Sequence, residues 1–489
     1  MNISKTNFTC ARQCHKRLWL TKYKPELAVI DESTESKFRT GHLVGEHAWN
    51  LFPGGICVDY CKDTSVMAAT TINLLNSGSK VIYEAAFVYR NLIAICDILV
   101  VTKEGFEVYE VKSSTSLKDT YLHDISFQCY VLRKCGFTVR KANIVYINNQ
   151  YVRYGALEYD KLFTIIDVSE IAAKNYDIIE KKIPEIESML AGEIPAIDIG
   201  LQCSDPYPCE FQAFCRQHIP EYSVFDLYRI REDKALDFYH KGVVTLRDIY
   251  DKRTKLNGIQ RLQVEAVINN RSNIDKAGIM QFLGQIDYPL YFLDFESYQE
   301  AVPTFDGCKP YDQIPFQYSL HYMESENGPL MHKEFLGIEG INPKSDLAES
   351  LCANINCNGT VIAYNAVFEG SILKKLAEEF PKLADHLVAI KNNLYDLIIP
   401  FRNGHYYVKE MKGSFSIKSV LPALFPEDEE LNYKKLKIQN GSAAMEAFPR
   451  LCDLPPDERI IVRNSLLEYC KLDTLAMVKI LEKLKAAVG

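Results

Sequence analysis

The segment that most constrains the fold is residues 91–112, with the sequence NLIAICDILVVTKEGFEVYEVK. A run rich in Leu, Ile and Val breaks at residues 103–105, Lys-Glu-Gly, and resumes as Phe-Glu-Val-Tyr-Glu-Val-Lys. Because β-branched and aromatic residues flank a tight-turn sequence, we predict a β-hairpin here. Side chains alternate along a strand, so Glu110 and Lys112 share one face of the second arm, and Asp97 lies in the apolar first arm.

Charged groups within a buried hairpin are costly unless they are paired or bind a metal ion. Asp97 and Glu110 could hold Mg²⁺ or Mn²⁺, and the neighbouring Lys112 could steady an attacking water or a phosphate. The alternative is an ordinary hairpin whose polar residues line a solvated face. The position of Asp97 among Ile, Cys, Ile and Leu favours the metal site.

Length, charge and cysteine content limit the class of protein. A chain of 489 residues predicts two or three domains. A formal net charge of -8 gives no overall attraction to nucleic acid, so any phosphate binding must come from local patches. No apolar run reaches membrane-spanning length, and the start of the sequence lacks the form of a secretion signal. Fifteen scattered cysteines fit a reducing compartment, so we expect a cytoplasmic protein without a membrane partner.

Three cysteines form a compact group beyond the hairpin. Cys203, Cys209 and Cys215 are separated by even gaps of five residues, and two prolines lie between the first pair. Four thiolates could hold Zn²⁺ or an iron–sulfur cluster, and a remote cysteine is needed as the fourth ligand. We choose Cys14, with Cys10 as the alternative. Zinc sites more often show gaps of two to four residues, and three buried free thiols are the simpler interpretation.

Asp97 followed by Glu110-x-Lys112, with one N-terminal cysteine and three cysteines after the hairpin, resembles the PD-(D/E)xK nucleases. The likeness is to the RecB-like iron–sulfur branch, which includes the CRISPR-associated exonucleases, and it covers about residues 1–220. The resemblance implies a divalent ion, Mg²⁺ or Mn²⁺, bound by Asp97 and Glu110. It also implies a [4Fe-4S] cluster held by four cysteines: Cys14, Cys203, Cys209 and Cys215.

Two predicted helices contain further residues that this family uses. Glu46 and His47 lie where RecB-like nucleases often place an extra metal ligand, although a surface histidine is equally compatible. Gln128 and Tyr130 resemble the glutamine and tyrosine motif with which this family binds DNA beside the metal. Because the tyrosine follows the glutamine by two residues and not by four, a tyrosine in the helix core is the alternative.

The rest of the first half and the segment after it are predicted to be mostly helical. We expect a strand at residues 141–149 and one long helix at residues 165–191. Residues 221–285 are more charged and also helical in pattern. Within them, residues 241–250 and 262–268 resemble a helix–hairpin–helix unit, which can present backbone N–H groups to phosphates. A plain helical linker is the interpretation that we prefer.

The last third contains three separated acidic motifs. A hydrophobic strand ends in Asp294 and Glu296, which share one face because they are two residues apart. A second predicted strand leads into a helix that begins near Glu369. Tyr469 and Asp473 are four residues apart, so they lie on the same face of a C-terminal helix.

These three motifs, in this order, resemble the tyrosine subtype of the DEDD exonucleases, which have an RNase H-like fold. The resemblance implies that Tyr469 orients the attacking water and that three carboxylates bind two divalent ions: Asp294, Glu296 and Asp473. Glu369 stands where the family has aspartate. Its longer side chain could still reach a metal through altered geometry, or it could mean weak or lost activity. Asp396 is a further carboxylate that we interpret as structural.

Together these features predict an α/β multidomain chain. We expect a RecB-like PD-(D/E)xK domain with an iron–sulfur cluster at residues 1–220, a helical linker at 221–285 and an RNase H-like domain at 286–489. The expected function is metal-dependent cleavage of DNA, at single-stranded ends, in two distinct active sites. Lysine-rich segments at residues 409–418 and 434–437 could contact the backbone of a strand.

Two alternatives remain open from the sequence. One is a nucleic-acid-binding or assembly module without turnover, which the glutamate at position 369 and the acidic net charge suggest. The other is an exonuclease whose substrate is RNA, because DEDD exonucleases act on either nucleic acid. The whole chain resembles bacterial proteins that join a RecB-like iron–sulfur domain to a C-terminal domain of unknown function.

Overall fold

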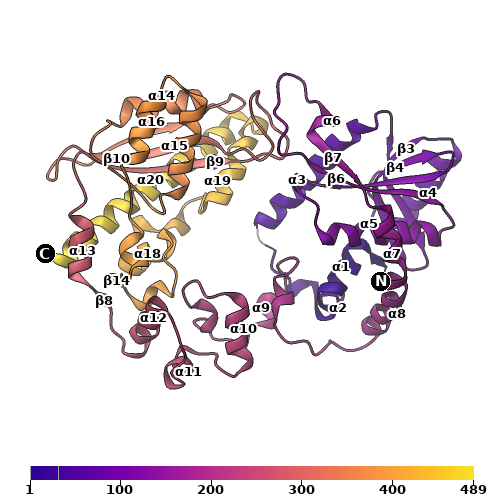
Figure 1. Ribbon diagram of the computed structural model, residues 1–489, viewed down its shortest axis with the longest axis horizontal. Coiled ribbons are helices and arrows are strands. Elements are labelled where there is room, and N and C mark those ends of the chain that lie inside the picture. The colour runs from indigo at the N-terminus through magenta and orange to yellow at the C-terminus, as the bar shows by residue number, and fades with distance from the viewer. Residues whose placement is uncertain (1, 31) are drawn as a thin grey trace. The chain divides into compact units, whose positions relative to one another are not determined.

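The computed structural model describes residues 2–30 and 32–489, and the chain divides into two compact units (Figure 1). Unit 1 comprises Met1–His218 and Glu300–Asp312, and unit 2 comprises Ile219–Gln299 and Gln313–Gly489. The segment expected to be a separate linker, residues 221–285, therefore lies within unit 2. Among the residues described, none of the helices has the length and apolar composition needed to cross a membrane.

Unit 1 is built on a seven-stranded sheet with the order β2-β3-β4-β5-β6-β7, and β1 pairs with β4. The hairpin expected from the sequence is present as β4 and β5, and the turn between them places Gly105 at φ +134°. The strands are β1 (Ile3–Ser4), β2 (Ile56–Cys57), β3 (Val81–Tyr89), β4 (Leu92–Thr102), β5 (Gly105–Lys112), β6 (Val139–Ile147) and β7 (Phe163–Asp167).

Helices cover both faces of this sheet. They are α1 (Lys5–Gln13), α2 (His15–Tyr23), α3 (Glu32–Ala48), α4 (Thr64–Asn76), α5 (Asp119–Lys134), α6 (Tyr159–Leu162), α7 (Ser169–Lys174), α8 (Tyr176–Ala191) and α9 (Gln212–Cys215). On one face α1, α4, α5 and α8 contribute to a large apolar cluster, in which the Phe8 and Phe127 rings stack 5.1 Å apart. On the other face α3 packs against Tyr83 and Tyr109. Alternation along β3 and β5 thus gives the sheet two buried sides.

The single long helix expected at residues 165–191 is wrong in its first part. Phe163–Asp167 forms strand β7, which pairs antiparallel with β6, and two helices follow in place of one. The β-branched residues of this segment can pair with the free edge of β6, and this pairing outweighs local helical spacing. Asn175 separates α7 from α8.

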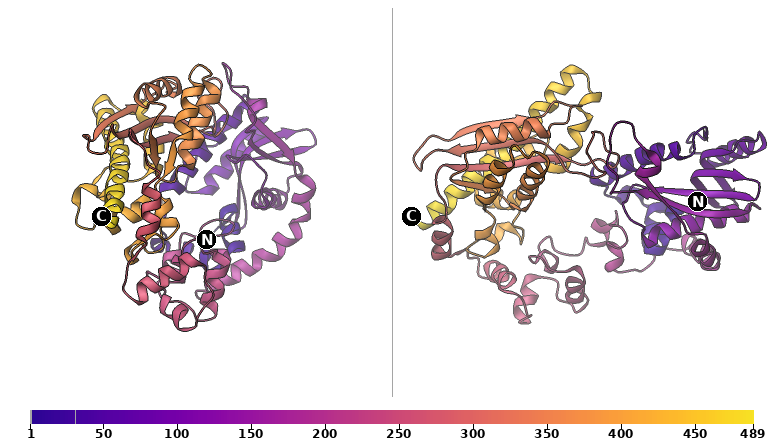
Figure 2. Two further views of the ribbon diagram at one scale, coloured as in Figure 1. Left: turned by 60° about the vertical axis from the view of Figure 1, so that its left-hand side comes forward. Right: turned by 45° about the horizontal axis from the view of Figure 1, so that its top comes forward.

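Unit 2 is built on a mixed five-stranded sheet with the order β11-β10-β9-β12-β13 (Figure 1). The β9, β10 and β11 strands are antiparallel, whereas β12 runs parallel to both β9 and β13. The strands are β9 (Leu290–Tyr298), β10 (Ile314–Met323), β11 (Met331–Leu336), β12 (Thr360–Ala363) and β13 (Leu394–Asp396). Figure 2 shows this sheet and its covering helices from two further directions.

The two faces of β9 have different neighbours. Tyr291, Leu293 and Phe295 pack into an apolar cluster with α14 (Lys344–Asn354), α15 (Val367–Glu379) and α16 (Ala384–Asn392). The opposite face, which bears Asp294 and Glu296, is covered by the long helix α20 (Pro456–Val488). Alternation along one strand therefore separates an apolar core from a buried acidic face.

The remaining helices of unit 2 are short. They are α10 (Glu232–His240), α11 (Leu246–Asp251), α12 (Gly258–Ile268), α13 (Lys276–Leu283), α17 (Ile399–Arg402), α18 (Ile417–Leu424) and α19 (Gly441–Ala447), and a two-stranded sheet pairs β8 (Asn273–Ile274) with β14 (Tyr406–Tyr407). The α10, α11 and α12 helices share a small apolar cluster that includes Phe238, Leu246 and Val264. The 221–285 segment is thus helical, as expected, and it has a core of its own.

Gly359 sets the approach of β12 to β9, because its φ is +85° and a side chain there would overlap the carbonyl oxygen of Pro289. We expect Gly359→Ala to lower the free energy of unfolding of unit 2 by about 2 kcal/mol or more. Gly242→Ala is the matched control, since its φ is +66° but nothing lies within 4 Å of the added carbon. That substitution should cost about 1 kcal/mol.

Urea denaturation measures both variants. Trp19 and Trp49 are the only two tryptophans and both lie in unit 1, so their fluorescence reports that unit, while far-UV circular dichroism reports both units. The Gly359→Ala change should shift the circular dichroism transition more than it shifts the fluorescence transition. Equal costs for the two glycines would show that the close backbone approach is unimportant.

Candidate metal centres

The first acidic site lies at the β4–β5 hairpin, where the structure brings Asp97 and Glu110 together. Asp97 Oδ2 accepts a hydrogen bond from the backbone N–H of Val111 at 2.6 Å, directly beside Glu110. Burial and then the charge of Glu110 raise the pKa of Asp97 to about 6. The antiparallel register, in which Ile98 pairs with Tyr109, produces this juxtaposition.

Two lysines hold Glu110, which is only 1% exposed. Lys112 Nζ lies 2.8 Å from Glu110 Oε1 and 2.7 Å from Asp124 Oδ2, and Lys5 Nζ donates to the same oxygen of Glu110. Burial opposes ionisation of Glu110, but Lys112 and Lys5 outweigh it and lower the pKa to about 2. Sequence reasoning missed Lys5, because it is 105 residues away from Glu110 in the chain.

Gln128 lies behind this carboxylate and is fully buried. Its Nε2 donates to Glu110 Oε2 at 2.6 Å and to the carbonyl oxygen of Ile95 at 2.8 Å. These contacts orient Glu110, and direct contact of Gln128 with nucleic acid stays a prediction. Tyr130 lies in the apolar core, 6.3 Å from the Tyr176 ring between centroids, so it corresponds to the core tyrosine alternative.

Glu84 on β3 is a third carboxylate of this site, which we name the first carboxylate cluster: Glu84, Asp97 and Glu110. The pairing of β3 with β4 skips from Tyr83 to Ala85, and Glu84 takes a left-handed φ of +55°, which is strained for a residue with a side chain. Burial, and then the charge of Asp97, raise the pKa of Glu84 to about 8. An acid inside the apolar stretch VIYEAAFVY was the available sequence signal.

The charges of this site suit a divalent cation. Four carboxylates, those of the first carboxylate cluster and Asp124, face two ammonium groups, those of Lys5 and Lys112. With every group ionised, four against two leaves two negative charges in excess. One Mg²⁺ or Mn²⁺ ion would neutralise that excess, and oxygen ligands are the type that these ions prefer.

Among the residues that the structure describes, no hydrogen bond or ion pair joins Glu46 or His47 to this cluster. The His47 ring is half-buried and lies 5.9 Å from the Tyr159 ring between centroids, and Glu46 is exposed. Burial lowers the pKa of His47. A metal-binding role for Glu46 or His47 stays a prediction.

The cysteines expected to bind a cluster come from three nearby segments of unit 1. Cys14 lies at the break between α1 and α2, Cys203 ends a short 3-10 helix (Leu201–Cys203), Cys209 lies in the loop before α9, and Cys215 is the last residue of α9. Gln13 Nε2 donates to the carbonyl oxygens of Gln202 at 2.7 Å and Tyr207 at 2.6 Å. This glutamine therefore ties the N-terminal helices to the cysteine-rich loop.

The two candidates for the fourth position, Cys14 and Cys10, differ in burial. Cys10 is buried in the large apolar cluster of unit 1, whereas Cys14 is half-buried. The pKa of the Cys215 thiol is raised by burial and also by the proximity of Cys203 and Cys14. Four thiolates on one Zn²⁺ would place their sulfurs about 3.8 Å apart. Among the described residues no three cysteine sulfurs lie within 4.8 Å of one another, and a metal group on these thiols stays a prediction.

The second acidic site lies between β9 and α20, and we name it the second carboxylate cluster: Asp294, Glu296 and Asp473. One carboxylate oxygen from each of these residues lies within 4.8 Å of the other two. Burial and mutual repulsion raise the pKa of Asp294 and of Glu296 well above the ordinary range. Burial raises the pKa of Asp473 to about 6. Such carboxyl groups hold protons until a cation replaces them.

Tyr433 and Lys418 complete this site, and sequence reasoning did not assign them roles there. Tyr433 Oη donates to Asp473 Oδ1 at 2.5 Å. Lys418 Nζ donates to Tyr469 Oη at 3.2 Å, and its charge lowers the pKa of both Glu296 and Asp473. Lys418 belongs to the lysine-rich segment at residues 409–418, but nothing in the sequence distinguishes it from Lys409 and Lys412.

Glu369 lies at the start of α15, beside the second carboxylate cluster but outside the group of three. It is 3% exposed, and among the described residues its Oε2 atom has no hydrogen-bond partner. Burial raises the pKa of Glu369 to about 8. A buried carboxylate oxygen without a partner beside Asp294 fits a cation site. By contrast, Asp396 accepts from the backbone N–H of Asn365 at 2.8 Å and of Ile398 at 3.1 Å, which indicates a structural role.

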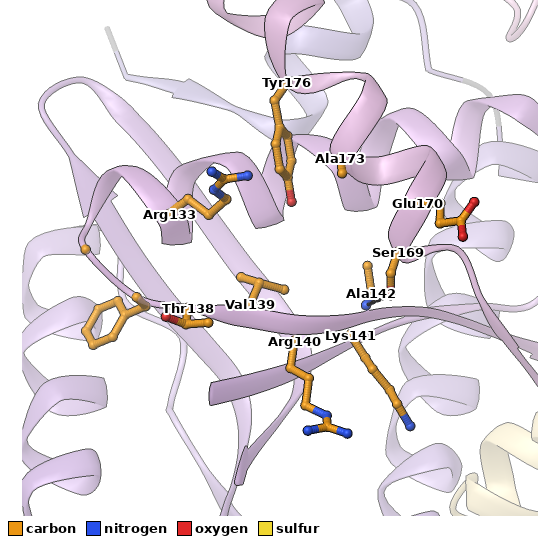
Figure 3. A pocket seen from close by; sticks show the side chains of 12 residues that line it. Arg133, Thr138, Val139, Arg140, Lys141, Ala142, Ser169, Glu170, Ala173 and Tyr176 are labelled. Atoms are coloured by element: carbon orange, nitrogen blue, oxygen red, sulfur yellow. Dashed lines mark hydrogen bonds between the residues drawn. The ribbon is translucent and has the colours of Figure 1, made fainter. Parts of the chain in front are cut away.

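A pocket of about 550 Å³ in unit 1 lies between α5, β6 and α7, and none of the predicted site residues lines it (Figure 3). Arg133 and the Tyr176 hydroxyl point into it, whereas Arg140 and Lys141 lie on the other side of β6 (Figure 3). It adjoins the start of β6, where Val139 pairs with Phe106, and Glu110 pairs further along with Ile144. This pocket is therefore separate from the first carboxylate cluster.

Comparison with known proteins gives two matches. Residues 291–416 match a family described as a domain of unknown function (DUF2779), and they include Asp294, Glu296 and Glu369. An uncharacterized protein, UU173, from Ureaplasma parvum serovar 3 is 28% identical over 235 residues, which cover 43% of this chain and 33% of the relative. The match thus spans about one third of the length of that relative. No solved structure matches the chain.

The raised pKa of Glu369 predicts how stability depends on pH. The pKa of Glu369 is about 8 in the folded chain, above its ordinary value of 4.5. At pH values between these two, the metal-free folded chain therefore binds more protons than the unfolded chain does. The free energy of unfolding should therefore fall as the pH rises from about 5 to about 8. Thermal unfolding in EDTA, followed by circular dichroism, measures this fall.

Glu369→Gln should make the fall clearly smaller, because it removes one titrating group. Glu378→Gln, an exposed position on the same helix, is the matched control and should keep the dependence of the parent protein. An unchanged pH dependence in Glu369→Gln would contradict the assignment of a buried protonated carboxyl at this position.

Proposed function

We propose that this protein is a metal-dependent nuclease with two distinct sites for hydrolysis of phosphodiester bonds. The observation that supports this function best is the second carboxylate cluster, in which a strand and a helix far apart in sequence place three carboxylate oxygens within 4.8 Å. Oxygen-rich sites of this kind suit Mg²⁺ or Mn²⁺. Bound there, such ions would lower the pKa of water and stabilise the attacking and leaving oxygens of a phosphate.

In unit 2 the chain's own residues have complementary tasks. Asp294, Glu296 and Asp473 would hold the ions, and the Tyr433 hydroxyl keeps Asp473 in place. The Tyr469 hydroxyl, held by Lys418, would orient the attacking water, and the Lys418 ammonium would stabilise negative charge on the phosphate. Glu369 would approach the same ions from α15, by way of its longer side chain.

In unit 1 the first carboxylate cluster would hold one ion, with Gln128 orienting Glu110. Lys112 would support deprotonation of water or the charge of the transition state, after release from its pairing with Asp124. The hairpin with its acid and Glu-x-Lys pattern supports a RecB-like PD-(D/E)xK domain. The mixed sheet of unit 2, with an acidic face under α20, supports an RNase H-like DEDD domain.

DNA with single-stranded ends is the proposed substrate, and RNA is the alternative that the assay below separates. Unit 1 would also hold a [4Fe-4S] cluster on Cys14, Cys203, Cys209 and Cys215. All fifteen cysteines are free thiols in the structure, which supports a location in the reducing cytoplasm.

Single substitutions should separate the two sites. We expect Glu110→Gln to lower one nuclease activity about a hundredfold or more, and Asp294→Asn to lower another by a similar factor. The measurement is digestion of end-labelled single- and double-stranded DNA and RNA with Mg²⁺ or Mn²⁺. Glu107→Gln on β5 and the exposed Asp346→Asn on α14 are the matched controls, and both should digest like the parent protein.

The pattern of loss decides among the functions. Cleavage of RNA but not of matched DNA would favour the RNA alternative. Binding of strands without cleavage by the parent protein would favour a nucleic-acid-binding or assembly module. If Glu110→Gln and Asp294→Asn digest every substrate as the parent does, neither cluster is an active site.

The cysteine assignment predicts a coloured protein. Purified without oxygen, the parent should be brown and contain about four irons per chain. Cys203→Ser and Cys14→Ser should lose the colour and the iron, whereas Cys10→Ser should keep both. Cys57→Ser, an exposed cysteine of unit 1, is the control. A colourless parent protein with stoichiometric zinc would overturn the iron–sulfur assignment.

A further inference from the structure

A second feature of unit 2 is a pocket of about 370 Å³ beyond the carboxyl ends of the parallel strands β12 and β13. This edge of a sheet is where ligands commonly bind in open α/β folds. The pocket has two arginines, three aromatic residues and two small polar residues among its lining: Tyr228, Arg229, Tyr364, Asn365, Arg402, Phe415 and Ser416.

The two arginines are available for an anion. Within the part of the chain that the structure describes, neither Arg229 nor Arg402 forms an ion pair. Arg402 Nη2 donates to Asn365 Oδ1 at 2.9 Å, but its Nε atom is buried without a hydrogen-bond partner. Arg229 is exposed and lies against the Tyr228 ring, 5.4 Å from its centroid. Guanidinium groups with free donors match the geometry of phosphate oxygens.

The aromatic residues form a fixed wall beside these arginines. The Tyr228 and Phe415 rings lie 4.6 Å apart between centroids, and Tyr364 Oη donates to the Phe415 carbonyl oxygen at 2.8 Å. Aromatic faces of this kind accept any nucleobase by stacking. The pocket therefore combines the two chemistries that a nucleotide presents, a phosphate and a flat base.

Two short chain segments connect residues of the pocket to residues at the second carboxylate cluster. Asn365 precedes Glu369 by four residues, about one helical turn, and Ser416 precedes Lys418 by two residues. A neighbouring pocket of about 400 Å³ at the start of α12 shares Tyr228 and Arg229 with this one. Two adjoining pockets that share an arginine suit a polymer of nucleotides better than one small molecule.

We propose that this pocket binds one nucleotide unit of a single-stranded nucleic acid next to the catalytic carboxylates. Arg229 and Arg402 bind its phosphate, and its base packs on the Tyr228 ring, which the buried Phe415 ring supports from behind. The inference rests on the proposed function, because it gives the strand a route to the second carboxylate cluster. It assigns the 221–285 segment, which contributes Tyr228 and Arg229, to substrate binding.

The test measures strand binding without cleavage. The full chain in EDTA is titrated against a fluorescein-labelled single strand of about 12 nucleotides, and anisotropy is followed at several salt concentrations. Arg229→Ala should weaken binding about tenfold and reduce the slope of log affinity against log salt by about 0.7. Arg229→Lys should recover part of the affinity. Arg253→Ala is the matched control, because both arginines are exposed and have a similar positive φ, +49° and +51°.

Competition with a free mononucleotide distinguishes two possible ligands of the pocket, a nucleotide within a strand and a free nucleotide. If deoxyadenosine monophosphate displaces the strand only weakly, a nucleotide within a strand is the ligand. If it binds tightly and depends on Arg229, the pocket binds a free nucleotide, and the strand assignment is overturned. Equal binding by the parent, Arg229→Ala and Arg253→Ala, with all three thermally stable, would overturn the inference as a whole.

Digestion with Mn²⁺ separates this inference from the function on which it rests. If the parent cleaves strands and Arg229→Ala cleaves with an unchanged KM, the nuclease stands and the pocket assignment fails. If the parent binds strands through Arg229 but does not cleave them, the pocket assignment stands and the nuclease fails.

Discussion

Like-charged carboxylates brought together away from water are the constraint on which both units depend. Loss of hydration makes the ionised form of each such carboxylate less stable, and repulsion from its acidic neighbours destabilises that form further. In unit 2 burial raises the pKa of Asp294, Glu296, Glu369 and Asp473, and the charges of the neighbouring cluster carboxylates raise those of Asp294 and Glu296 further. A fold that only needed stability would place apolar or paired residues there, and this is why we propose the cluster as a cation site.

The two units relieve this repulsion in different ways. In unit 1 two lysines pair directly with Glu110. Within the described part of the chain, Glu84 has no such partner: its backbone is left-handed and its pKa is raised. In unit 2 Lys418 donates to Tyr469, and its charge only partly offsets the burial that raises the pKa of Glu296 and of Asp473. The first site is thus closer to charge balance, and the second depends more strongly on protons or metal ions. This difference gives the two sites different expected responses to pH.

Sequence patterns predicted the elements of each site well where the spacing is local. Alternation along β9 placed Asp294 and Glu296 on one face, and four-residue spacing placed Tyr469 and Asp473 on one face of α20. The tight-turn sequence and its β-branched flanks predicted the β4–β5 hairpin, whereas the register seen in the structure brings Asp97 beside Glu110. The helix expected at residues 165–191 failed at its start, because pairing with the edge of β6 depends on a strand elsewhere in the chain.

The sequence by itself determined which residues have the right chemistry and on which face of a strand or helix each one lies, since periodicity is a local property of the backbone. Only the tertiary structure decided which distant groups meet: Lys5 with Glu110, Glu84 with Asp97, and Lys418 with Tyr469. It likewise brought Arg229 and Arg402 to one pocket. These partners depend on strand order and helix packing, which bring together segments from 13 residues apart (Glu84 and Asp97) to more than a hundred (Lys5 and Glu110). Burial of apolar surface, and not local spacing, decides such pairings.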